Sequence, residues 1–175
     1  LREHRPAWPV PRILQLFEAG PDDSKMFEGN TLNTPSLMCV EDYLDALSWA
    51  EAEGGEDALI ARTRKNAATL NAWVAKTDWI APLPVDPATR STTSVTLKFA
   101  DPAITARSQA EQWEVTRRMV ALLDAENAAY DVKPHPKAPA GLRIWCGPTV
   151  DAADLEALGP WLDWAYARAR EDAAA

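Results

Sequence analysis

The sequence predicts a mixed α/β fold, in which two long helices are followed by a small domain of strands and helices. Within residues 35–52, four apolar side chains recur at the i, i+3, i+4, i+7 spacing of a buried helix face. These residues are Val40, Tyr43, Leu44 and Leu47. Residues 93–99 instead alternate apolar and polar side chains, as a half-buried strand does. Prolines interrupt the chain between residues 82 and 87, so we expect one domain over residues 1–82 and another over 88–175.

Local signals place the two helices of the first domain. A helix is expected over residues 35–52. Thr34 can cap it and Pro35 suits its first position, while the glycine pair at 54–55 suits its end. A second helix is expected over residues 56–76, with an apolar stripe on one side.

The second domain is expected to follow the order strand, helix, strand, strand, helix. After the strand at 93–99, helical spacing returns over residues 106–127. Residues 129–132 and 142–146 are expected to be strands, and the last helix begins near Asp151. This order predicts a two-layer α/β unit.

The composition limits the function classes. The 175 residues are 47% hydrophobic and carry a net charge of −8, which argues against binding to nucleic acid or to an anionic membrane. No apolar run approaches the roughly 18 residues of a membrane span, and no signal peptide opens the chain, so a cytoplasmic protein is expected. Cys39 and Cys146 form no disulfide framework and no metal-ligand spacing, and both are expected to be buried free thiols.

Two positions are candidates for binding an anion. The helix that follows Asn33 and Thr34 presents free N–H groups beside an amide and a hydroxyl, which suits an anion but also describes an ordinary capped helix. In the strand 142–146, Arg143 and Trp145 point away from the apolar face. The planar guanidinium of Arg143 matches a carboxylate, which could belong to an Asp or Glu of the chain or to a ligand.

Four stretches of the chain resemble phosphoserine aminotransferases, a family of class V aminotransferases that depend on pyridoxal 5′-phosphate (PLP). They are Pro-Ala-Trp-Pro-Val-Pro at 6–11, the segment 29–47 that begins Gly-Asn-Thr-Leu-Asn-Thr-Pro, Arg-Ser-Thr-Thr-Ser-Val at 90–95, and 138–147 with its Gly-Leu-Arg. The resemblance implies the C-terminal portion of a fold type I PLP-dependent transferase. Residues 1–82 would then be the end of the large PLP-binding domain, and residues 88–175 the small C-terminal domain.

The resemblance also implies roles for individual residues. Arg143 matches the arginine that binds the substrate α-carboxylate, while Asn33 and Thr34 match a pair that reaches the cofactor phosphate of the other subunit in a homodimer. Where the family carries His-Arg or Arg for the substrate phosphate, this chain has Pro136 and Lys137, with His135 one step earlier. Lys137 offers a point charge without the fork of an arginine.

The family's Schiff-base lysine precedes the Pro-Ala-Trp-Pro stretch, and we reject Lys98 as its counterpart, so this chain by itself is expected to be inactive. The intact enzyme would exchange an amino group between phosphoserine and 2-oxoglutarate, yielding glutamate, in serine biosynthesis. Its protein partner would be a second copy or the N-terminal part of the same enzyme. Two alternatives remain: a related aminotransferase for a small, non-phosphorylated amino acid, and a non-catalytic α/β dimerisation module.

Overall fold

The computed structural model describes residue 11, residues 28–29, residue 34 and residues 36–172. The chain divides into two compact units, Leu1–Ala52 and Glu53–Ala175. This division comes earlier than the boundary near residue 82 that the prolines suggest. The reason is that α2 (Gly55–Val74) packs against α5 (Ala152–Asp172) and β1 (Ile80–Pro82), and so belongs with the second unit.

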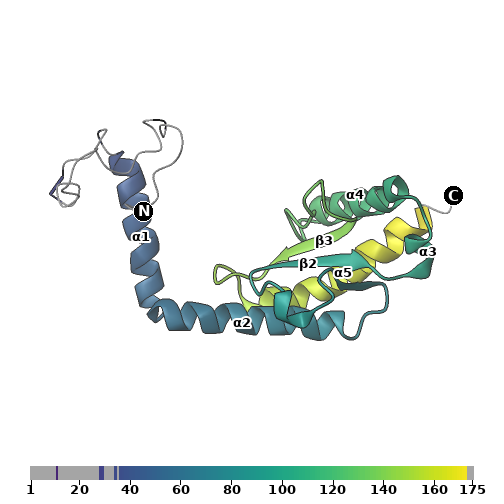
Figure 1. Ribbon diagram of the computed structural model, residues 1–175, viewed down its shortest axis with the longest axis horizontal. Coiled ribbons are helices and arrows are strands. Elements are labelled where there is room, and N and C mark those ends of the chain that lie inside the picture. Colours follow the sequence, from purple (N-terminus) through teal and green to yellow (C-terminus); the bar gives the residue numbers. More distant parts are fainter. Residues whose placement is uncertain (1–10, 12–27, 30–33, 35, 173–175) are drawn as a thin grey trace. The chain divides into compact units, whose positions relative to one another are not determined.

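The described helix of the first unit is α1 (Leu37–Ala52), labelled in Figure 1. The backbone N–H of Cys39 donates to the Ser36 hydroxyl (3.4 Å), and the N–H of Val40 donates to the Ser36 carbonyl (3.2 Å). Ser36 therefore caps α1, and the prediction that Thr34 is the cap is wrong. A serine at this position satisfies the N–H of the third helical residue, which would otherwise lack a partner.

The apolar face predicted for α1 is not buried among the described residues. Its four members, Val40, Tyr43, Leu44 and Leu47, are all exposed, and Tyr43 is 66% exposed. Within Leu1–Ala52, no other described helix or strand is available to cover them. Cys39 is exposed for the same reason, so its predicted burial is wrong, whereas Cys146 is buried as predicted.

The second unit contains an antiparallel sheet in the order β1-β2-β3, formed by β1, β2 (Ser94–Phe99) and β3 (Gly141–Trp145). The strands predicted at 93–99 and 142–146 are confirmed. Residues 129–132 do not form a strand: Asp131 has a φ of 53°, which takes the backbone out of the extended region. One strand-like contact remains, in which the N–H of Arg143 donates to the carbonyl of Val132 (2.9 Å).

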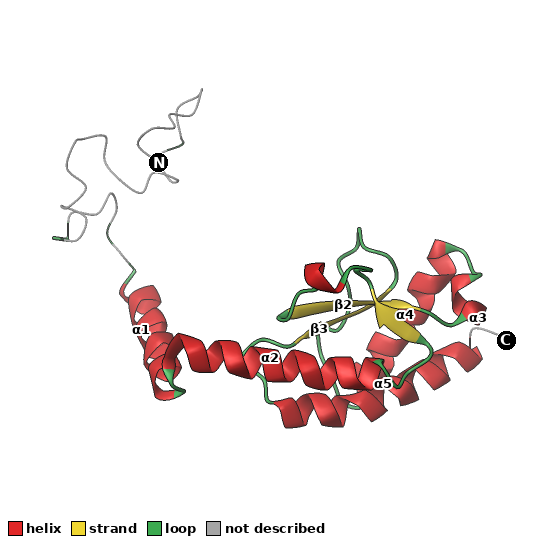
Figure 2. Cartoon of the chain, turned by 60° about the horizontal axis from the view of Figure 1, so that its bottom comes forward, coloured by secondary structure: helices red, strands yellow, loops and turns green. Residues whose placement is uncertain are grey.

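Helices cover one face of this sheet. The short α3 (Pro102–Thr105) precedes α4 (Gln109–Ala125), and a single 3-10 turn, η3 (Pro87–Thr89), lies between β1 and β2. A capping box starts α4: the Ser108 hydroxyl accepts from the Glu111 N–H (3.3 Å), and the Ser108 N–H donates to the Glu111 carboxylate (2.8 Å). The helix α4 packs on β3 and on α5, and α2 lies beside α5 (Figure 2).

The core lies between the sheet and these helices. It includes Val95, Leu97, Met119, Leu123, Leu142, Ile144 and Leu162, all of them buried. The alternate residues of the strands point to the opposite face, where they are half-buried or exposed. Those residues are Ser94, Thr96, Lys98, Arg143 and Trp145. The predicted two-layer α/β unit is therefore confirmed, with one open sheet face.

Asp101 joins α3 to α5. Its carboxylate accepts a hydrogen bond from the N–H of Ala103 (2.8 Å), which caps α3, and it also accepts from the Tyr166 hydroxyl and from Nη1 of Arg170 (3.2 Å). The Tyr166 hydroxyl, then the Ala103 N–H and then Arg170 hold the pKa of Asp101 below its usual value. The carboxylate is thus stabilised in its ionised form.

Asp101 is expected to make stability depend on acid pH. Because its pKa is lowered in the folded state, its contribution is present above the unfolded pKa of about 4 and is lost as the pH falls through the folded value. Asp101→Asn should lower the free energy of unfolding at pH 7 by about 1–2 kcal/mol. Urea denaturation at neutral pH and at about pH 3 measures this, and the gap from wild type should shrink in acid. A gap that is equal at both pH values would contradict the assignment.

Candidate functional site

Arg143 lies on the open face of the sheet. In the register of β2 and β3, Arg143 pairs with Thr96, and the residues before and after it, Leu142 and Ile144, are buried in the core. The Arg143 side chain is 39% exposed. The predicted orientation of this strand is therefore correct, and the guanidinium faces away from the core.

One acidic partner lies near this guanidinium. Nη2 of Arg143 donates to Oδ2 of Asp131 (2.8 Å), and the Asp131 side chain is 83% exposed. An exposed pair of this kind contributes about 0–1 kcal/mol to stability. A guanidinium carries five N–H donors, and this contact uses one of its nitrogens. The internal salt bridge considered from the sequence is present, but it is weak enough to be exchanged for a ligand carboxylate.

Thr116 and Gly141 hold the start of the strand that carries Arg143. The buried Thr116 hydroxyl accepts from the Gly141 N–H (3.1 Å) and lies 3.3 Å from the Gly141 carbonyl, to which it donates. Gly141 has a φ of 151° and lies against β2 so closely that an added Cβ would be 2.1 Å from the carbonyl oxygen of Leu97. This close contact sets the position of β3, and with it the position of Arg143.

His135 and Lys137 form a turn in the segment that leads to β3. The N–H of Lys137 donates to Nδ1 of His135 (3.1 Å), and the N–H of Ala138 donates to the His135 carbonyl (2.8 Å). Both side chains are exposed. Because Nδ1 accepts a hydrogen bond, the neutral imidazole carries its proton on Nε2, where it can donate. The turn thus presents a cation and one N–H donor to solvent.

The other predicted anion position belongs to the first unit. Asn33 lies outside the described residues, and Thr34 is described and exposed. The first turn of α1 contains no acidic residue, and no hydrogen bond joins the Thr34 hydroxyl to another residue in the described part of the chain. A hydroxyl beside a helix N-terminus that lacks carboxylates suits a phosphate group.

Comparisons with known proteins show which enzymes this chain is similar to. Over 95% of its length, the chain is 42% identical to the phosphoserine aminotransferase of Methanosarcina mazei and, equally, to that of Methanosarcina barkeri. Sequence identity with the phosphoserine aminotransferase of a Nocardioides species is 33% over 89% of the chain. The chain is homologous to phosphoserine aminotransferases. It spans 42% of the length of the two Methanosarcina enzymes. No protein-family model matches the chain.

A solved structure of phosphoserine aminotransferase shares the fold. The TM-score is 0.66 at 17% sequence identity, and the match covers 91% of this chain and 39% of the solved chain. The expected fold, that of part of a fold type I PLP-dependent transferase, is therefore confirmed. The chain thus matches a similar share of the solved chain (39%) and of the two Methanosarcina enzymes (42%).

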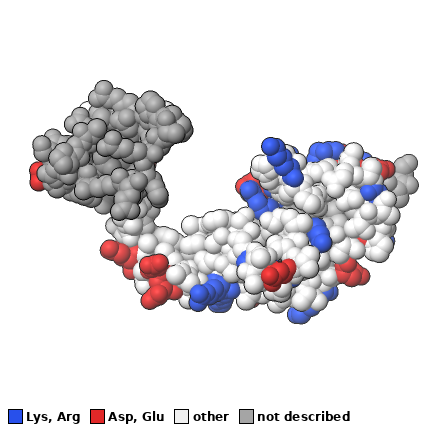
Figure 3. All heavy atoms as spheres, viewed as in Figure 1, with Lys and Arg blue, Asp and Glu red and all other residues white. Residues whose placement is uncertain are grey.

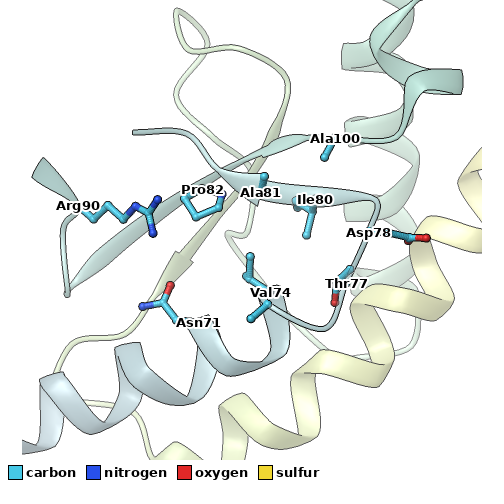
Figure 4. A pocket seen from close by; sticks show the side chains of 10 residues that line it. Asn71, Val74, Thr77, Asp78, Ile80, Ala81, Pro82, Arg90 and Ala100 are labelled. Carbon is cyan, nitrogen blue, oxygen red and sulfur yellow. The ribbon is translucent and has the colours of Figure 1, made fainter. Parts of the chain in front are cut away.

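A hollow of about 490 Å³ lies elsewhere on the second unit, between the end of α2 and β1 (Figure 4). Its lining is mostly apolar and comprises Asn71, Val74, Ala75, Thr77, Asp78, Ile80, Ala81, Pro82, Arg90 and Ala100. Arg90 belongs to one of the stretches that resemble phosphoserine aminotransferases, but its Nε donates to the carbonyl of Pro84 (3.2 Å) and its Nη2 to that of Val85 (3.4 Å). None of the residues predicted to bind substrate or cofactor lines this hollow.

Charged side chains are scattered over the face of the second unit that Figure 3 shows. On the face of the second unit that Figure 3 shows, lysine and arginine form separate spots rather than a continuous stripe. Within the described residues, no helix is long and apolar enough to cross a membrane, and no three His, Cys, Asp or Glu side chains are grouped to hold a metal ion. Burial raises the pKa of the Cys146 thiol to about 11, so this thiol is protonated near neutral pH.

The sequence did not indicate two residues that act on Arg143. Asp131 lies 12 positions before Arg143 and Thr116 lies on α4, so both contacts depend on the tertiary fold. Asp131 has a left-handed backbone conformation (φ 53°), which aspartate adopts more readily than most residues because its short polar side chain can hydrogen-bond locally. The sequence signal for Asp131 was weak, since residues 129–132 also fit a strand.

Proposed function

We propose that this chain is part of a PLP-dependent phosphoserine aminotransferase, which exchanges an amino group between phosphoserine and 2-oxoglutarate to give 3-phosphohydroxypyruvate and glutamate. The observation that carries the proposal is the 42% identity to two curated phosphoserine aminotransferases over 95% of the chain. The intact enzyme would be a cytoplasmic homodimer that acts in serine biosynthesis.

Arg143 would bind the substrate α-carboxylate. Its guanidinium is exposed on the open sheet face, and its contact with Asp131 leaves donors available. A carboxylate that accepts two parallel N–H bonds from this group would be fixed in both position and orientation. Gly141 and Thr116 support the role, because they fix the strand two residues away.

Asn33 and Thr34 would hold the PLP phosphate of the partner subunit. When bound, PLP withdraws electrons from the substrate carbon that carries the amino group. The chain's own contribution would be a hydroxyl, an amide and the N-terminus of α1. Lys98 lies within β2, in the sheet of the expected small domain, and would not be the cofactor lysine. The resemblance implies that the Schiff-base lysine precedes the Pro-Ala-Trp-Pro stretch, so this chain alone would be inactive.

Lys137 and His135 would bind the substrate phosphate. Both are exposed on the turn before β3, and the neighbouring Pro136 cannot provide a charged group. A lysine attracts phosphate as a point charge, with less geometric selectivity than an arginine. The presence of Lys137 where the family carries an arginine is the observation that favours the second candidate, an aminotransferase for a small non-phosphorylated amino acid.

Lys137→Ala in the intact enzyme separates these two candidates. If Lys137 binds the phosphate, kcat/KM for phosphoserine should fall by about tenfold or more, since a hydrogen bond to a charged group contributes about 1.5–3 kcal/mol. The value for serine or alanine should stay within about twofold, because neither substrate carries the group that Lys137 contacts. Steady-state kinetics with the three donors measures this. Equal losses on all three donors would favour the non-phosphorylated substrate.

The proposed function is tested with the intact enzyme, that is, the full-length protein that contains this chain. Glutamate formation is measured with PLP, 2-oxoglutarate and one of the three donors. The proposal predicts turnover with phosphoserine and a lower kcat/KM with the other two. Turnover with serine or alanine alone would support the second candidate. No turnover with any donor, from a folded and dimeric protein, would support the non-catalytic dimerisation module.

A further inference from the structure

Lys98 lies on the same open sheet face as Arg143 and has no role in the proposed site. The strand β2 alternates half-buried and buried residues, and Lys98 belongs to the half-buried set together with Thr96. In the register of β2 and β3, Thr96 pairs with Arg143, while Lys98 pairs with Gly141, two residues before Arg143. Lys98 and Arg143 are therefore diagonal neighbours, with Cβ atoms about 7–8 Å apart, which is within reach of long side chains.

The hydrogen-bond pattern brings this row of side chains close together. The N–H of Cys146 donates to the carbonyl of Thr93 (2.6 Å), and hydrogen-bonded pairs alternate with non-hydrogen-bonded pairs along antiparallel strands. Thr96 and Arg143 therefore form a non-hydrogen-bonded pair, in which side chains lie closer to each other. The N–H of Arg143 agrees with this pattern, because it donates away from β2, to the carbonyl of Val132.

The neighbours of Lys98 leave room for its side chain on the open face. Its partner in β3 is Gly141, which has no side chain, and its partner in β1 is Ala81, which adds one methyl group. In the part of the chain that the structure describes, the Lys98 side chain makes no hydrogen bond and no ion pair. Arg143, in contrast, contacts the exposed Asp131. Two neighbouring cations on one surface attract a ligand that carries a negative charge at each end.

We propose that Lys98 is a specificity-determining residue that binds the distal carboxylate of a dicarboxylate whose other end is held by Arg143. In 2-oxoglutarate four C–C bonds of about 1.5 Å separate the two carboxyl carbons, which places them about 5 Å apart. The flexible stem of a lysine adjusts to this distance, while the planar fork of Arg143 fixes the other end. The site would then prefer a dicarboxylate to a monocarboxylate of the same length. This inference rests on the carboxylate-binding role of Arg143 in the proposed function.

Two ligands that do not react test the inference in the intact enzyme with PLP bound. Glutarate and pentanoate both have five carbons, but glutarate carries two carboxylates and pentanoate one. Isothermal titration calorimetry measures the Kd of each, and wild type should bind glutarate about tenfold or more tightly than pentanoate. Lys98→Met removes the ammonium at similar length. It should raise the Kd for glutarate about tenfold and leave that for pentanoate within about twofold.

Further variants separate the charge of Lys98 from its position. Lys98→Arg keeps the charge and should bind glutarate within about threefold of wild type, whereas Lys98→Gln should behave as Lys98→Met does. Lys76→Met changes an exposed lysine just after α2 and should leave both Kd values unchanged. Lys137→Met tests the rival position: a loss of glutarate binding in this variant, with none in Lys98→Met, would assign the distal carboxylate to the turn before β3. Thermal unfolding of each variant checks that it is folded.

The inference is overturned if wild type fails to prefer glutarate, if Lys98→Met binds glutarate as wild type does, or if the variant loses both ligands equally. Arg143→Ala should weaken both ligands. If it weakens neither, the proposed role of Arg143 fails, and the inference fails with it. A loss with Arg143→Ala but not with Lys98→Met would overturn the inference alone. None of these Kd values depends on transamination, so absence of turnover with any amino donor would refute the proposed function alone.

Discussion

Gly141→Ala is expected to destabilise the chain by about 3 kcal/mol or more, because the added methyl group meets backbone that cannot move aside. The new Cβ would lie 2.1 Å from the Leu97 carbonyl oxygen and 2.9 Å from the Cα of Lys98, both within the neighbouring strand. Relief would require β3 to separate from β2. Urea denaturation of wild type and variant measures the loss.

Thr116 provides the control for this prediction. Thr116→Val removes both hydrogen bonds to Gly141 without adding a clash, and it should cost about 1–3 kcal/mol, the penalty for buried polar groups left unpaired. Thr116→Ser keeps the hydroxyl and should cost less. A Gly141→Ala variant within about 0.5 kcal/mol of wild type would show that the two strands are not held as closely as described.

Arg143→Ala in the intact enzyme is expected to cost about 2–4 kcal/mol of transition-state binding, because a bidentate carboxylate contact is lost. The loss is measured as a fall in kcat/KM. Arg143→Lys should recover part of this loss, since an ammonium lacks the planar fork. The free energy of unfolding should change by no more than about 1 kcal/mol, because the pair with Asp131 is exposed to solvent. Steady-state kinetics and urea denaturation of each variant measure the two quantities.

Asp131→Asn separates the salt bridge from the substrate role. It breaks the ion pair but keeps Arg143, and asparagine tolerates the left-handed backbone at this position. The variant should keep most of the activity if Arg143 serves the substrate. An Arg143→Ala enzyme that is less stable and fully active would instead make the internal salt bridge its only role.

The two long strands of the sheet were predictable because their signal is local. Alternation in 93–99 and 142–146 follows from the two-residue period of a strand, and it also indicated correctly that Arg143 and Trp145 point away from the core. The strand β1 was not predicted, since it has three residues and ends in Pro82, a residue typical of a break. Its position depends on pairing with β2, which no local pattern shows.

The first helix shows a different limit. Its period predicted a helix correctly, and the capping residue was off by two positions because Thr34 and Ser36 carry the same chemical signal. Periodicity also indicates which face a helix buries but not what covers it. The face of Val40 and Tyr43 is exposed in the described part of this chain, although its spacing is that of a buried face.

The chemistry of Arg143 was easier to predict from the sequence than the residues that contact it. A guanidinium in an apolar strand pointed to a carboxylate without any knowledge of the fold, and the exposed Arg143 agrees with that expectation. Asp131 and Thr116 could not be assigned in advance. Asp131 contacts Arg143, and Thr116 contacts Gly141 at the start of the same strand, and both contacts form only when separate parts of the chain come together.

The most direct measurement of the central claim compares the two proposed substrates of the intact enzyme. Both phosphoserine and 2-oxoglutarate carry a carboxylate next to the reacting carbon, and one arginine is proposed to bind it in both. Rapid-mixing kinetics of each half-reaction, in wild type and in Arg143→Ala, should show losses that agree within about threefold, each about thirtyfold or more. Losses confined to one substrate, or no loss on either, would contradict the assignment of Arg143 as the carboxylate-binding residue.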